Sequence, residues 1–166
     1  MTYLIESLGA CGAEGLLNRQ HTLSRQLLRR LTGTDIVEHD AEGAPFLPSR
    51  PDLHISISHC RTAVAVAVSD TAAVGIDIEC RRRIGDGLIE RVCTPDERDA
   101  IDRSDDSTME FLRFWTQKEA VLKCRGTGIR GFGSMIDAST AHDCTVTELA
   151  TGLPDTVAAL AVAKAE

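Results

Sequence analysis

The sequence predicts an α+β fold, because stretches with helical periodicity and stretches with strand periodicity both occur along the chain. Leucines recur at helical spacing through residues 13–32, and apolar residues alternate with other residues from 53 to 79. Helical spacing returns at 107–124, and alternation returns at 144–150 and 156–163. The 166 residues are enough for one compact domain, or for two small halves that share a core.

The first helix is expected over residues 13–32, where the leucines form one face and Gly33 is a typical C-terminal residue. Its other face carries Arg19, Arg25 and Arg29. A solvated helix face is the ordinary interpretation of such arginines, and a phosphate-binding set is the alternative.

Three strands are expected in succession, at 54–58, 63–68 and 74–79. Two helix starts follow. Thr94 with Glu97 three residues later forms a capping-box pattern, and Ser107 with Glu110 repeats it. The second of these helices is expected to end near Cys124.

Composition excludes several classes of protein. A net charge of −7 and an aromatic content of 4% argue against a nucleic-acid partner, which needs a basic face and stacking rings. The six cysteines form no C-x-x-C pair, so we expect reduced thiols and no zinc knuckle. No charged-then-apolar leader opens the sequence, and the longest aliphatic run, 63–68, is too short to cross a bilayer. We therefore expect a cytoplasmic protein without a membrane partner.

The segment Gly75-Ile76-Asp77-Ile78-Glu79 brings two carboxylates together. Side chains alternate along a strand, so Asp77 and Glu79 point to one face. Like charges this close repel unless a cation lies between them, and hard oxygen ligands suit Mg²⁺ or Mn²⁺. A solvent-facing strand end is the alternative.

The helix at 107–123 contains a second anomaly, because Lys118 falls within its apolar arc, where an ammonium group loses hydration. Glu119 and Lys123 flank that arc, and an ordinary surface ion pair between them is the alternative to a functional role. Ser58 and His59 occupy the end of a strand and can face a ligand, although a histidine in a turn can also be structural.

These segments resemble those of the 4′-phosphopantetheinyl transferases of the longer, two-half kind. Residues 75–79 are similar to the family's G-[IV]-D-[IVL]-E strand, and 115–123, Trp-Thr-Gln-Lys-Glu-Ala-Val-Leu-Lys, to its W-x-x-K-E-A-x-x-K helix. Residues 57–60 resemble its strand-ending S-H-S, and 43–45 its G-K-P segment. Two positions depart from the pattern, with Ala44 in place of a lysine and Cys60 in place of a serine.

The resemblance implies two similar α+β halves, approximately 1–72 and 73–166, packed as an intramolecular pseudo-dimer with coenzyme A in the cleft between them. It also implies roles for individual residues. The three residues expected to bind Mg²⁺, or Mn²⁺, together with the pyrophosphate are Asp77, Glu79 and Glu119. The residues expected to contact the coenzyme or its phosphates are Ser58, His59, Lys118 and Lys123. Because the two halves already form the cleft, we expect a monomer.

The implied reaction transfers the 4′-phosphopantetheine group of coenzyme A to a serine of an apo acyl or peptidyl carrier protein, with release of 3′,5′-ADP. Glu119 is the candidate general base, and Lys123 would stabilise the developing phosphate charge. The run at 81–83, three arginines, is either a docking patch for an acidic carrier or a solvated loop.

Two alternatives remain. One is a transferase-like protein that binds coenzyme A or a carrier protein with little or no turnover, as Ala44 suggests. The other is a different metal-dependent phosphotransfer or hydrolytic enzyme. The sequence contains no G-x-x-x-x-G-K-[ST] loop, which argues against that second option.

Overall fold

The computed structural model describes residues 1–9, 14–127 and 141–164, and the mixed α and β architecture confirms the predicted fold class. The helices are α1 (Leu16–Thr32), α2 (Leu88–Val92), α3 (Pro95–Arg103) and α4 (Ser107–Cys124). The strands are β1 (Thr2–Ser7), β2 (Glu38–His39), β3 (Pro45–Phe46), β4 (His54–His59), β5 (Ala63–Ser69), β6 (Val74–Cys80), β7 (Cys144–Leu149) and β8 (Thr156–Ala163).

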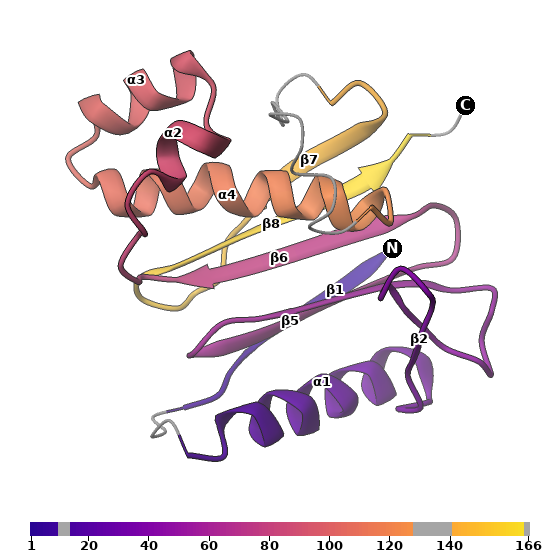
Figure 1. Ribbon diagram of the computed structural model, residues 1–166. Helices are drawn as coiled ribbons and strands as arrows, with labels where there is room; N and C mark the ends of the chain where they lie inside the picture. Colours follow the sequence, from indigo (N-terminus) through magenta and orange to yellow (C-terminus); the bar gives the residue numbers. More distant parts are fainter. Residues whose placement is uncertain (10–13, 128–140, 165–166) are drawn as a thin grey trace.

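Two three-stranded antiparallel sheets form the centre of the molecule. The first has the order β1-β5-β4 and the second β6-β8-β7, while β2 and β3 form a separate short pair. Figure 1 shows the two sheets between α1 and α4, which lie on opposite sides of the molecule. The turn between β5 and β6 includes residue 72, so each proposed half contains one sheet. The similarity of the two halves stays a prediction.

The alternation in β5 explains how the layers stack. Val64, Val66 and Val68 pack with Leu27 and Leu28 of α1. The alanines at 63, 65 and 67 face the other way and pack with Ile76 and Ile78 of β6. Valine fills the wide space beneath a helix, and alanine lets the two sheets approach closely.

The two sheets also meet along β4 and β6, where serine hydroxyls replace a backbone ladder. The Ile76 amide donates to Ser56 Oγ at 3.0 Å, and the Ile78 amide donates to Ser58 Oγ at 3.3 Å. Both serines are buried. The amides on this edge of β6 therefore have partners although β4 belongs to the other sheet. We call this line of contact the serine seam.

Helix α4 lies directly on β6 because Gly75 has no side chain. A Cβ atom at Gly75 would lie 1.9 Å from the Ala120 carbonyl oxygen and 2.4 Å from the Cys124 amide nitrogen. Real Cβ atoms do not approach backbone this closely. Glycine at this position sets the distance between the helix and the strand.

The helix starts follow the sequence prediction with one correction. Thr94 and Glu97 form the predicted capping box of α3. In α4, however, the capping side chain is that of Asp106, which accepts a hydrogen bond from the Met109 amide, and Ser107 is the first helical residue. An aspartate carboxylate is as good a cap as a serine hydroxyl, so the pattern alone left the choice open.

No helix within the described residues is both long enough and apolar enough to cross a membrane.

Candidate functional site

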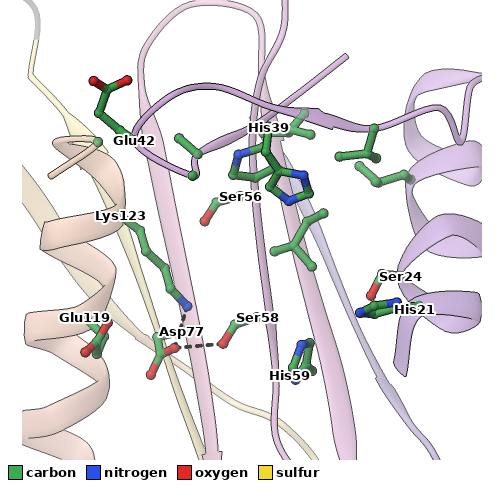
Figure 2. Close-up of a pocket in the computed structure, with 18 of the residues that line it drawn as sticks. His21, Ser24, His39, Glu42, Ser56, Ser58, His59, Asp77, Glu119 and Lys123 are labelled. Carbon is green, nitrogen blue, oxygen red and sulfur yellow. Dashed lines mark hydrogen bonds and ion pairs between the residues drawn. The ribbon is translucent and has the colours of Figure 1, made fainter. Parts of the chain in front are cut away.

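A cavity of about 830 Å³ lies between α1 and α4, with β4 and β6 as its floor and the β2–β3 segment above it. Figure 2 labels ten of its polar side chains, and the carboxylate of Glu42 points away from the others. The charged and histidine side chains that line it are His21, Arg25, His39, Glu42, His59, Asp77, Glu79, Glu119 and Lys123. The carboxylates of β6 and α4 lie on one side and the basic groups of α1 on the other.

Asp77 lies at the centre of the acidic side. Its side chain is buried, and its Oδ1 atom accepts hydrogen bonds from Ser58 Oγ and from Lys123 Nζ, each at 2.7 Å. Its Oδ2 atom is buried and has no hydrogen-bond partner. Two alternatives that the sequence left open for these residues are therefore wrong. Asp77 is not on a solvent-facing strand end. Lys123 forms its ion pair with Asp77 and not with Glu119 on the helix surface.

Glu119 faces the same area from α4. Burial, followed by the nearby charge of Asp77, raises the pKa of Glu119 to about 7, although Lys123 opposes the shift. Trp115, Glu119 and Lys123 are four residues apart, so they lie along the side of α4 that lines the cavity. A carboxyl group of this pKa can lose or accept a proton at neutral pH.

Glu79 completes the acidic group but is already paired. Its carboxylate accepts from Arg82 Nη2 at 2.9 Å and from Arg82 Nε at 3.2 Å. Glu79 is turned toward Arg82, and Asp77 is turned toward Lys123. Among the described residues, no group of three or more His, Cys, Asp or Glu side chains is arranged so that it could already hold a metal ion.

The residues nevertheless fit a hard divalent cation. The Oδ2 atom of Asp77 is a buried acceptor without a hydrogen-bond partner. Burial and the nearby charge of Asp77 disfavour the ionised form of Glu119 and raise its pKa. A cation bound between the two carboxylates would give Oδ2 a partner and would favour the ionised form of Glu119. The oxygen donors suit magnesium or manganese better than zinc.

The opposite side of the cavity is basic and polar. Arg25 and His21 come from α1, His39 from β2 and His59 from the end of β4. Burial lowers the pKa of His59, and the charges of Lys123 and His21 lower it further. Of the three arginines expected to share a face of α1, only Arg25 lines the cavity. Arg19 donates to the Leu8 carbonyl, and Arg29 pairs with Asp35.

Lys118 is the one predicted site residue that the structure places elsewhere. Its side chain is 1% exposed, and its Nζ lies 2.8 Å from Glu97 Oε1 of α3. Glu97 is itself buried, and its other oxygen accepts from the Thr94 amide. One step of about 100° around α4 separates Lys118 from Glu119, which turns it away from the cavity side. The expected contact with the coenzyme is therefore corrected to a buried ion pair between α3 and α4.

Several cavity residues were missed by the sequence prediction. His21 lies one turn before Arg25 on α1, a spacing that was available in the sequence but weak beside the leucine pattern. His39 and Glu42 belong to a segment without periodicity, and no sequence signal pointed to them. Ala44, which stands where the resembling family has lysine, does line the cavity.

The chain was compared with known proteins. The family model that matches residues 73–160, more than half of the chain, describes the 4′-phosphopantetheinyl transferase superfamily. The chain is 33% identical to a 4′-phosphopantetheinyl transferase of Bacillus subtilis over 89 residues, which are 52% of this chain and 39% of that protein. It is 31% identical to the 4′-phosphopantetheinyl transferase HetI of Nostoc sp. over 126 residues, 67% of this chain and 53% of that protein.

A third relative, the 4′-phosphopantetheinyl transferase AcpT of Salmonella typhimurium, is 29% identical over 128 residues, 74% of this chain and 67% of that protein. The chain spans about half or less of the length of the first two relatives. The family match falls on the part of the chain that supplies Asp77, Glu79 and Glu119 of the cavity.

Proposed function

The chain belongs to the 4′-phosphopantetheinyl transferase superfamily, and from that premise we propose that it transfers the 4′-phosphopantetheine group of coenzyme A to a serine of an apo acyl or peptidyl carrier protein. The products would be the holo-carrier protein and 3′,5′-ADP. One observation carries the proposal beyond family membership: a buried, partly unsatisfied carboxylate group faces a set of basic side chains across a single cavity. A ligand with a metal-bound diphosphate and a further phosphate has this distribution of charge.

In this proposal Asp77, Glu79 and Glu119 hold Mg²⁺, with Mn²⁺ as the alternative. The cation supplies charge neutralisation and alignment of the coenzyme pyrophosphate when it is bound. Binding of the cation would require only a small rearrangement of side chains. Lys123 would move away from Asp77, and Arg82 would move away from Glu79. The cationic side chain of each ion pair is partly exposed to solvent. Lys123 then lies beside the phosphate that reacts and stabilises its developing negative charge.

Glu119 is the proposed general base, directly or through a water. The serine hydroxyl of the carrier attacks the β-phosphate of coenzyme A, its proton passes to Glu119, and the bond to the 3′,5′-ADP leaving group breaks. Without a cation the pKa of Glu119 is raised to about 7; a cation held by its carboxylate would lower that pKa and keep Glu119 ionised, so that it can accept the proton. Trp115, one turn earlier on α4, forms part of the cavity wall.

Ser58 and His59 are proposed to contact the coenzyme phosphates from the floor of the cavity. His59 lines the cavity at the end of β4 (Figure 2). Ser58 already donates its hydroxyl to Asp77, so it also holds that carboxylate in position. The basic side formed by Arg25 and His21 is the place where the remaining phosphate of the coenzyme would lie.

We further propose that the protein acts in the cytoplasm as a monomer. The three-arginine run is a poor candidate for the carrier-docking patch. Arg81 pairs with Asp106 and Asp155, so one of the three charges is already neutralised. Arg82 is paired with Glu79 in this structure and would be released only when Glu79 binds the cation. Exposed arginines of this kind add little binding energy individually.

The decisive experiment incubates the chain with coenzyme A, Mg²⁺ and several apo-carrier proteins, followed by mass spectrometry of carrier and coenzyme. A carrier that gains the mass of phosphopantetheine supports transfer. Coenzyme binding without any gain on the carriers would favour the transferase-like binding protein, which the alanine at position 44 suggests. Coenzyme breakdown without a gain on the carrier would favour hydrolysis. Asp77→Asn is the control, because it removes the proposed metal ligand at nearly constant volume.

A further inference from the structure

The turn that follows His59 is held from α1 by the side chain of Gln20. Gln20 Nε2 donates a hydrogen bond to the Cys60 carbonyl oxygen at 2.9 Å, across 40 positions of the sequence. Gln20 is 6% exposed and is not one of the residues that line the cavity. A buried amide needs a partner, and this one joins α1 to the connection between β4 and β5.

The same turn is also held through the residue that follows β1. The Leu8 amide donates to the Thr62 carbonyl at 2.8 Å, and the Leu8 carbonyl accepts from Arg19 Nη2 at 2.6 Å. Two consecutive residues of α1, Arg19 and Gln20, thus reach the turn by separate paths, one through Leu8 and one direct. The turn is fixed at two points, Cys60 and Thr62, and a connected set of hydrogen bonds of this kind keeps it rigid relative to α1.

His59 depends on this turn for its position. It is the last residue of β4, and its exposed side chain lines the cavity (Figure 2). A side chain that is not enclosed by packing is positioned by the backbone that carries it. His59 is paired with Val64 across the β4–β5 hairpin, so the turn directly joins this pair. A displacement of the turn would therefore displace the imidazole.

Resting on the proposed function, we propose that Gln20 is a positioning residue, which through the Cys60 carbonyl holds the turn that places His59 against a phosphate of coenzyme A. In this role Gln20 touches neither the coenzyme nor the cation. Two other roles make different predictions. Gln20 could serve only to fasten α1 to the first sheet, or it could act through His21, the next residue of α1, which also lines the cavity.

A matched pair of substitutions tests the contact. Gln20→Met removes the amide donor at similar length, and Gln26→Met makes the same substitution at an exposed position of α1 outside the cavity lining. Titration calorimetry with coenzyme A and saturating Mg²⁺ measures affinity at a temperature at which melting curves show every variant to be folded. We expect Gln20→Met to weaken coenzyme binding about threefold to tenfold, the scale of one lost hydrogen bond. Gln26→Met should leave the affinity unchanged.

A double-variant cycle with His59→Ala assigns the effect. In the His59→Ala background, Gln20→Met should change the affinity by less than about twofold, because the group that Gln20 positions is gone. A loss that persists in full in that background shows that Gln20 acts through another residue, such as His21, and overturns the inference. If Gln20→Met does not fold, Gln20→Asn replaces it, since that amide is one methylene too short to reach Cys60, and the same comparisons decide.

The failures of this inference and of its premise are distinguishable. If His59→Ala weakens coenzyme binding while Gln20→Met lowers only the melting temperature, Gln20 is a purely structural residue, and the proposed function stands. If His59→Ala binds the coenzyme as the parent does, the proposed contact of His59 is wrong, and this inference fails with it. If the parent does not bind coenzyme A, the proposed function fails first.

Discussion

Gly75→Ala tests how closely α4 lies on β6, and with it the geometry of the site. The new Cβ would lie 1.9 Å from the Ala120 carbonyl oxygen and 2.4 Å from the Cys124 amide nitrogen. Both atoms are backbone, so no side chain can turn aside. Because the favourable separation of nonbonded heavy atoms is about 3.5 Å, the helix must move away from the strand by about 1.5 Å. Glu119 and Lys123, which flank the contact, would move with it.

We expect this overpacking to lower the free energy of unfolding by about 3 kcal/mol and the transfer rate by about 100-fold, because misplacement on the scale of 1 Å disrupts alignment of the reacting groups. Urea denaturation and a single-turnover transfer assay measure the two quantities. Gly85→Ala is the matched control. Nothing lies within 4 Å of its new Cβ, and its backbone is not left-handed, so a neutral effect or a gain below about 1 kcal/mol is expected. Parent-like stability and activity of Gly75→Ala would refute the close approach of helix and strand.

Three further predictions concern charged groups. Because the pKa of Glu119 is raised to about 7, the parent should lose stability as the pH rises from the unfolded value near 4.5 to about 7. In paired urea denaturation experiments without a divalent cation, the stability of Glu119→Gln relative to the parent should therefore be about 1–2 kcal/mol greater near pH 8 than near pH 4. Equal differences at both pH values would contradict this. Asp77→Asn should abolish the rise in melting temperature that Mg²⁺ gives the parent. An undiminished rise would show that Asp77 is not a ligand of the metal. Lys118→Met leaves the buried carboxylate of Glu97 without its lysine partner, so the free energy of unfolding measured by denaturant titration should fall by about 3–5 kcal/mol. The double change Glu97→Met/Lys118→Met should recover most of that loss. A neutral single variant would argue against the buried pair.

The sequence predicted the acidic side of the site well, because that side depends on local geometry. Strand alternation placed Asp77 and Glu79 on one face, and helical spacing placed Glu119 and Lys123 beside an apolar arc. Both relations involve residues a few positions apart. The burial of Asp77 was missed, because it depends on the second sheet edge lying against β6, which no local pattern specifies.

The basic side depends on tertiary structure and could not be predicted in the same way. His21, His39 and His59 are far apart in the sequence and come together because α1, β2 and the end of β4 all border one cavity. The strands β2 and β3 have two residues each, too few for any periodicity. Lys118 shows the converse limit: the helical arc correctly placed it on a buried face, but the partner, Glu97, lies on another helix.

The serine seam has a mechanical consequence. A backbone ladder fixes two strands in register, because each bond joins atoms that cannot turn independently. In the seam, the amides of Ile76 and Ile78 are held by hydroxyl groups, so the junction between the two sheets depends on the side chains of Ser56 and Ser58. Ser58 Oγ also donates to Asp77 at the floor of the cavity. One hydroxyl therefore serves both the junction of the two sheets and the orientation of the central carboxylate, so losing it would disturb both.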